Sequence, residues 1–101
     1  MKESALCPRL AKAMELIGKR WTALIIYQLL DGPQRFNAIE SALPISGRLL
    51  SERLKELEKE AIVERKMYSE VPIRVEYSLT EKGRSLEGTV REIEKWAQKW
   101  T

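Results

Sequence analysis

Few residues in this sequence could carry covalent chemistry. The chain of 101 residues has no histidine and a single cysteine, Cys7. The lack of histidine excludes His-dependent catalytic triads and histidine metal ligands. A lone cysteine excludes an intrachain disulfide and a zinc site built from several thiolates, and a single free thiol is typical of a reducing compartment. We therefore expect a cytoplasmic protein that is no enzyme and needs no metal or cofactor.

Cationic residues gather at the start of segment 46–60. Its first part carries Arg48, Arg53 and Lys55, whereas three glutamates crowd its last five residues. On a helix these charges make one basic end and one acidic end, with the acids where the helix macrodipole disfavours them. A basic helix end suits the phosphates and base edges of nucleic acid, and scattered surface charge is the alternative. The net charge of +3, from 18 basic and 15 acidic residues, is weak support by itself.

Glycine, proline and apolar spacing delimit the elements that must position these residues. Hydrophobic residues make up 44% of the chain and charged residues 33%, which is typical of one soluble domain over 1–101. The longest apolar run, Trp21 to Leu30, is about half a membrane span, so we expect no membrane partner. The spacing predicts helices over 9–17, 20–30, 37–43, 47–60 and 81–100, and strands over 62–69 and 74–79.

The apolar positions of these elements predict a core. The second helix is nearly all apolar, the fourth carries one stripe at helical spacing, and the second strand alternates. The expected core residues are Leu24, Ile25, Leu29, Leu30, Ile39, Leu43, Leu50, Leu54, Leu57, Ala61, Val75, Tyr77 and Leu79.

Helix 37–43, a short turn and helix 47–60 have helix-turn-helix spacing. In that motif the second helix enters the major groove by its N-terminal residues. Here these residues are small or cationic, so the backbone could approach phosphates and Arg48 could reach a base edge. A plain helical hairpin in a bundle is the alternative.

The two strands would form a wing beside the helix-turn-helix. Arg74 at the hairpin tip suits a minor groove or a phosphate, although a solvated turn arginine is the bland interpretation. Arg53, on the flank of the fourth helix, could extend its head outward. The fold class is thus mainly α, a winged helix-turn-helix with N- and C-terminal dimerisation helices. The predicted DNA contacts are Arg35, Ser46, Gly47, Arg48, Ser51, Arg53, Lys55 and Arg74.

The last helix is long for so small a domain, and two tryptophans lie near its end. Exposed tryptophans are costly. A twofold dimer would bury them and set two recognition helices one DNA turn apart; the alternative is that they fold back onto their own chain. The predicted dimer residues are Leu10, Met14, Leu86, Val90, Ile93, Trp96 and Trp100.

A series of short motifs runs along the chain. In order they are Cys7-Pro8, Leu16 to Trp21, Arg35-Phe36, Ile45-Ser46, Leu50 to Leu57, Glu70 to Tyr77, and Leu79 to Gly83. Together they resemble the HxlR-type bacterial transcription regulators, relatives of the MarR group, over about residues 6–100. The resemblance implies a homodimeric winged-helix protein that binds DNA, with dimer contacts from the first and last helices and no catalytic site.

Some members of this group resemble the chain further, with a sensor cysteine just before that proline. The resemblance implies that Cys7 responds to quinones, electrophiles or oxidants. Pro8 suits the first helical position, so Cys7 would be the N-cap, where unpaired N–H groups and the helix dipole stabilise a thiolate. Arg9 and Lys2 are near in sequence.

Sensors in this group often use a second cysteine, which this chain lacks. That leaves a Cys7–Cys7 bridge across a dimer, a mixed disulfide with a small thiol, or alkylation by a quinone. A buried, inert cap is the alternative.

We therefore predict a dimeric repressor that binds a palindromic operator in double-stranded DNA and loses affinity when Cys7 is modified. One alternative is a winged-helix protein-interaction module, and another is an HxlR-type regulator without thiol sensing. Steep weakening of DNA binding by salt would exclude the interaction module. A thiol enzyme built on Cys7 would lack both a base and a partner cysteine.

Overall fold

The computed structural model describes residues 7–101, so Lys2, expected near the thiol, lies outside the described residues. These residues form six helices and one two-stranded hairpin, the mainly helical fold with a wing that the spacing predicts. The elements are α1 (Pro8–Ile17), α2 (Thr22–Leu29), α3 (Phe36–Ala42), α4 (Gly47–Lys59), β1 (Val63–Tyr68), β2 (Arg74–Leu79), α5 (Glu81–Arg84) and α6 (Glu87–Trp100).

Three helices begin where a side chain caps them. In each, the acceptor takes the amide three residues further along: Ser46 Oγ at 3.1 Å, Thr80 Oγ1 at 3.0 Å and Cys7 Sγ at 3.5 Å. These caps satisfy N–H groups that have no partner within the helix. The cap that the sequence predicts for α1, Cys7, is therefore confirmed. Helix α2 begins at Thr22, later than expected, because Trp21 has a left-handed φ of 82°.

The core lies between α2, α3, α4, the base of the hairpin and the start of α6. Three expected core residues lie outside it, and two others, Leu43 and Tyr77, are only partly buried against it. One of the three is Val75, which is half-buried on β2. Leu24 is on the outward face of α2, and Ile26 takes its place; Ala61 is exposed because α4 has already ended and the chain turns there with a φ of 59°. The buried apolar residues are Ile25, Ile26, Leu29, Leu30, Ile39, Ile45, Leu50, Leu54, Leu57, Ile62, Val63, Leu79 and Val90.

The last helical segment is broken, whereas the spacing predicts one helix over 81–100. Helix α5 ends at Arg84 and α6 begins at Glu87. A side chain at Gly83 would collide with the carbonyl of Ile62, so the first turn packs tightly on the strand. Ser85 Oγ donates to the backbone carbonyl of Lys82, a local bond that competes with helix continuation.

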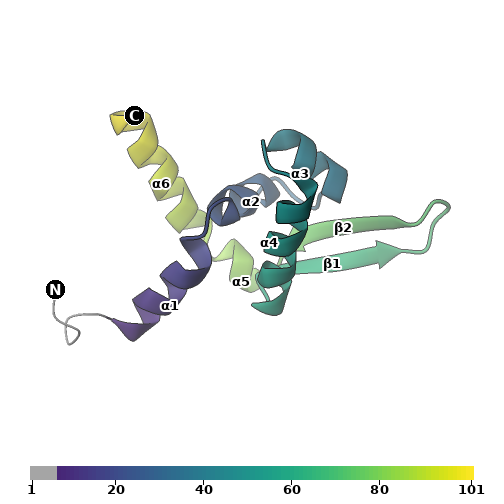
Figure 1. The fold of residues 1–101 in the computed structure, drawn as a ribbon, viewed down its shortest axis with the longest axis horizontal. Coiled ribbons are helices and arrows are strands. Elements are labelled where there is room, and N and C mark those ends of the chain that lie inside the picture. Colours follow the sequence, from purple (N-terminus) through teal and green to yellow (C-terminus); the bar gives the residue numbers. More distant parts are fainter. Residues whose placement is uncertain (1–6) are drawn as a thin grey trace.

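The hairpin and the terminal helices project from opposite sides of the helical body (Figure 1). Strands β1 and β2 are antiparallel, with a register that runs from Val63 opposite Leu79 to Tyr68 opposite Arg74. Gln34 adds a single bridge to the backbone of Tyr77. Helices α1 and α6 both contact α2 and diverge from it. Within residues 7–101, no helix is long and apolar enough to cross a membrane.

Candidate nucleic-acid interface

Helices α3 and α4 form the helix-turn-helix, and Gly47 lies where they approach each other. A Cβ at Gly47 would come within 2.6 Å of the Glu40 carboxylate and would also meet Phe36. We predicted that this glycine lets the backbone approach phosphates. The structure shows that the absence of a side chain here leaves room for Glu40 and Phe36 of α3. The approach to phosphates stays a prediction.

The N-terminal end of α4 displays the predicted reading residues. The side chain of Arg48 is 90% exposed and makes one contact with a carboxylate, its Nε lying 3.7 Å from Glu52 Oε1. Ser51 is half-buried one turn from the cap, and Lys55 is exposed. A pair at that distance on a helix surface is weak, so the guanidinium of Arg48 is free to find another anion. Ser46 is exposed at the same end.

Arg35 is exposed immediately before α3, where its carbonyl accepts the first helical hydrogen bonds. The structure brings it into the same helix-turn-helix unit as Arg48. Arg65 of β1 is a further exposed cation that sequence reasoning passed over, and it makes no ion pair within residues 7–101. Its place among three consecutive charged residues, 64–66, on a predicted strand could have indicated from the sequence that it is exposed.

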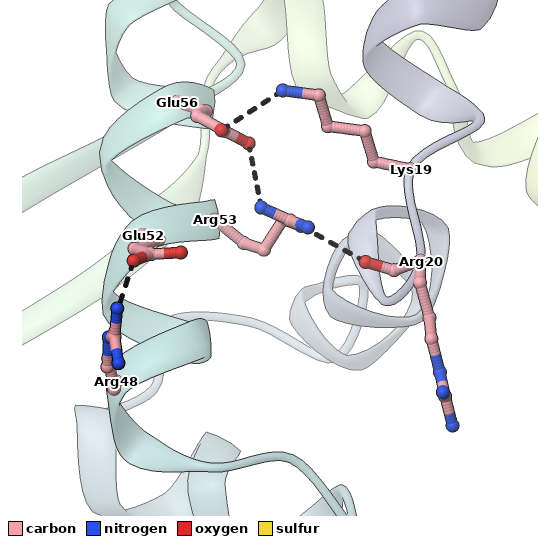
Figure 2. Close-up of polar contacts among 6 residues, drawn as sticks. All are labelled: Lys19, Arg20, Arg48, Glu52, Arg53 and Glu56. Atoms are coloured by element: carbon pink, nitrogen blue, oxygen red, sulfur yellow. Dashed lines mark hydrogen bonds and ion pairs between the residues drawn. The ribbon is translucent and has the colours of Figure 1, made fainter.

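Arg53 does not extend outward as expected, because its side chain is only 17% exposed. Its Nε donates to the backbone carbonyl of Arg20 at 3.1 Å, and its Nη1 lies 3.5 Å from Glu56 Oε1 (Figure 2). Arg53 follows Arg48 by five positions, which corresponds to about 140° around a helix. The guanidinium of Arg53 thus faces the turn between α1 and α2, and we leave it out of the proposed DNA contacts.

Arg74 is also held within the protein. Its side chain is 29% exposed, with Nη2 at 2.9 Å from Glu70 Oε2 and Nη1 at 3.3 Å from Glu76 Oε2. The guanidinium carbon lies 4.2 Å from the centre of the Tyr68 ring, a cation–π distance. Two carboxylates and one aromatic ring hold this arginine, and its Nε is buried without a hydrogen-bond partner within residues 7–101. The alternative of a solvated turn arginine is therefore wrong, and we leave Arg74 out of the proposed DNA contacts.

Cys7 is exposed and lies at the start of α1. Its Sγ accepts the N–H of Leu10, and its carbonyl accepts the N–H of Ala11. The expected position at the N-cap is confirmed, and the alternative of a buried thiol is wrong. In the part of the chain that the structure describes, no group of three acidic or thiol side chains is placed to hold a metal ion.

The outer faces of the terminal helices are apolar. Trp96 and Trp100 are 62% and 65% exposed, so they do not fold back onto the chain. Val90 was expected in the dimer interface, but it is buried in the protomer's own core, where the start of α6 meets α2. Leu86 packs against that core as well. The predicted dimer residues that remain exposed are Leu10, Met14, Ile93, Trp96 and Trp100.

Polar contacts also join α6 to α2. The hydroxyl of Tyr27 donates to the Glu94 carboxylate, and Arg91 lies over the Tyr27 ring at 5.5 Å. The bond to Glu94, with its negative charge, raises the pKa of Tyr27 above its ordinary value of 10.0. The phenol therefore stays protonated at neutral pH and keeps donating this bond.

The fold and the exposed end of α4 define a winged helix-turn-helix protein. Residues 16–101 match the sequence pattern of the HxlR-like helix-turn-helix family. The chain belongs to this family and is a DNA-binding transcriptional regulator. It is 56% identical over 101 residues to the HTH-type transcriptional regulator YvaP of Bacillus subtilis. The aligned region covers 99% of this chain and 94% of YvaP.

Solved structures of two further regulators share the fold. The reduced form of the transcriptional regulator YodB from B. subtilis has a TM-score of 0.83 and 48% identity, and covers 94% of each chain. YodB has also been solved with a quinone bound, at a TM-score of 0.80 and 46% identity, covering 94% of this chain and all of that one. The redox regulator HypR in its oxidized form has a TM-score of 0.88 and 40% identity, and covers 94% and 98% of the two chains.

Proposed function

We propose that this regulator is a homodimeric repressor that binds a palindromic operator and releases it when Cys7 is modified by a quinone, another electrophile or an oxidant. One observation carries the proposal: an exposed thiol caps α1, the helix that also carries an exposed apolar face. The amide that bonds the sulfur belongs to Leu10, which is part of that face.

DNA binding is assigned to the N-terminal end of α4. Arg48 would read a base edge, because an exposed arginine at this end of a recognition helix can pair with the O6 and N7 atoms of guanine. Ser46, Ser51, Lys55 and Arg35 would hold phosphates around it. Counterion release from these contacts predicts steep weakening by salt, which a protein-interaction module would not show.

The dimer is assigned to α1 and α6. Five large apolar side chains lie exposed on these two helices, and apolar surface of this kind on a small regulator marks an interface. A twofold axis between two such pairs would place both copies of α4 on one face of the duplex.

The thiol chemistry needs no second cysteine within one chain. With a quinone, the Cys7 thiolate adds to a ring carbon, a sulfur–carbon bond forms, and the ring takes up the electron pair and protons to become a hydroquinone. With a diazene oxidant, Cys7 and the partner's Cys7 lose two electrons and two protons to form a disulfide, and the diazene becomes a hydrazine. Either product displaces the sulfur from the Leu10 amide. The quinone-bound state of YodB and the oxidized state of HypR support this assignment.

The test is the affinity for the DNA upstream of the protein's own gene, before and after benzoquinone or diamide. Treated wild-type protein should lose at least about tenfold in affinity, a coupling typical of regulators. Before treatment, Cys7→Ser should bind the DNA as tightly as the wild type, and treatment should not change its affinity. Equal release of Cys7→Ser would remove the thiol from the mechanism. Binding by both proteins with no response would leave a regulator without thiol sensing.

The dimer has its own test in sedimentation velocity. Trp96→Glu with Trp100→Glu should give a monomer, because two charges cannot enter an apolar interface. Gln98→Glu is the matched control, since Gln98 is exposed on the same helix about 200° around from Trp96. A double variant that still sediments as a dimer would show that α6 is not the interface.

A further inference from the structure

Helix α1 is weakly held by the body of its own protomer. It has no buried residue, and among its side chains Leu16 packs against the core. An open groove of about 670 Å³ runs between α1 and the C-terminal end of α4, with Lys19 and Glu56 in its lining. The direction of α1 is therefore set mainly by the turn 18–21 that joins it to α2.

Two residues restrict the shape of that turn. A side chain at Gly18 would collide with the carbonyl of Met14, so the end of α1 must close tightly. Trp21 follows with a φ of 82°, which a bulky residue keeps only where its surroundings hold it. The Trp21 ring packs against the core, and the guanidinium of Arg20 lies 4.9 Å from its centre.

Two side chains of the recognition helix α4 contact this turn (Figure 2). Arg53 donates to the carbonyl of Arg20 at 3.1 Å, and Glu56 accepts from Lys19 at 3.1 Å while also pairing with Arg53. We call these four residues the turn clamp. The ion pair between Lys19 and Glu56 joins residues 37 apart. Every other ion pair within residues 7–101 joins residues at most four apart.

Two residues of the clamp are partly shielded from water, whereas Lys19 keeps 44% of its side-chain surface exposed. Arg53 and Glu56 keep 17% and 35% of their side-chain surface exposed, so water screens their contacts less than it screens exposed pairs. The guanidinium has two different acceptors, one carbonyl and one carboxylate, which fixes its direction as a single contact would not. A carbonyl of the turn and a lysine of the turn are thus both bound to one rigid helix.

We propose that the turn clamp transmits the position of α1 to the recognition helix α4. Arg53 is then a positioning residue for the DNA-contact residues of that helix. Arg53 is five residues from Arg48, about 7.5 Å along the axis of α4, and Cys7 is about 15 Å from the turn along α1. A tilt of α1 that moves the turn therefore moves α4, and with it the reading residues. The signal at Cys7 and the DNA contacts of α4 rest on the proposed function, whereas the mechanical link between α1 and α4 does not.

The first experiment measures the clamp without any thiol signal. In a Cys7→Ser background, spin labels go on Arg9→Cys in α1 and Lys55→Cys in α4, diluted about tenfold with unlabelled protein so that one protomer in a dimer is labelled. The distance distribution by pulsed electron spin resonance should be narrow. Arg53→Met, which keeps the aliphatic stem, should broaden or shift it, and the milder Lys19→Met should do the same to a smaller extent.

Lys59→Met is the matched control, because it removes one positive charge by the same substitution from α4, and Lys59 is exposed and makes no ion pair within residues 7–101. It should leave the distribution narrow. Circular dichroism melts confirm that each variant is folded. A distribution unchanged in both Arg53→Met and Lys19→Met would overturn the proposal, whatever the role of Cys7.

The second experiment tests transmission of the signal. With the native Cys7, alkylation by benzoquinone is followed by mass spectrometry and operator affinity by anisotropy. Lys19→Met should be alkylated at the wild-type rate, but its loss of affinity on alkylation should fall from roughly tenfold to less than about twofold. An undiminished loss in Lys19→Met would refute transmission through the clamp, whereas a wild-type protein that does not respond would refute the thiol sensor alone.

Discussion

The recognition helix and the wing each carry an arginine that the sequence predicts to contact DNA, and the two are in opposite states. Arg48 at the start of α4 is almost fully exposed and has one weak surface pair. Arg74 at the base of the wing loop is held by Glu70, Glu76 and the ring of Tyr68. The difference shows that the type of a residue and its position in a motif do not establish whether its side chain is free to contact DNA. The exposed arginine is the one that we propose to read a base edge, whereas the other is held against the hairpin.

The largest expected effect comes from Arg48→Ala. A bidentate pair with guanine discriminates against the wrong base by about 1–3 kcal/mol, so operator preference over random duplex should fall by roughly 5- to 150-fold. Competition binding with the two duplexes measures it. Unchanged preference would remove Arg48 from base readout and with it one side of the comparison.

Lys55→Ala should act differently, because a lysine on the outer side of α4 is suited to a phosphate. Its loss should weaken operator and random DNA alike, about five- to tenfold at 0.1 M salt, and reduce the slope of log affinity against log salt by about 1. Titrations at several salt concentrations give both quantities. A loss confined to the operator would mean that Lys55 reads bases.

Arg74→Ala sharpens the other side of the comparison. It should change operator affinity by no more than about threefold, while amide exchange in β1 and β2 accelerates, because three contacts that order the hairpin are lost. Hydrogen exchange and binding are measured on the same sample. A loss as large as that of Arg48→Ala, with hairpin protection intact, would make Arg74 a DNA contact after all.

The smallest effect should come from Glu52→Gln. It removes the carboxylate 3.7 Å from Arg48, so the guanidinium has less competition for DNA, and affinity should rise about twofold. The same binding assay detects the change, with Glu92→Gln on α6 as control, since Glu92 forms an exposed surface pair with Lys95. A fall in affinity would show that Glu52 holds Arg48 in its reading position.

Much of the fold could be predicted because its signals are local. Ser46 and Cys7 cap the helices that follow them, as their types and neighbours indicate, and the apolar stripe of α4 is buried at Leu50, Leu54 and Leu57. A cap or a stripe depends on residues within a few positions of one another, so one sequence suffices.

The misses concern contacts across the fold. The helical wheel places Arg53 on a flank of α4, but it cannot say that the turn 18–21 passes beside that flank and offers a carbonyl. Val90 was assigned to the outer stripe of α6 because the break before Glu87 was not foreseen, and it belongs to the core. Which of two apolar faces turns inward is decided by neighbours distant in sequence.

The most direct test of the account is the structure of the protein bound to its operator. We predict α4 in the major groove with the guanidinium of Arg48 within hydrogen-bond distance of a base edge, while Arg74 keeps its contacts with Glu70, Glu76 and Tyr68 as seen in the free protein. An Arg74 that has left those partners for the minor groove, with Arg48 still in solvent or on Glu52, would contradict it.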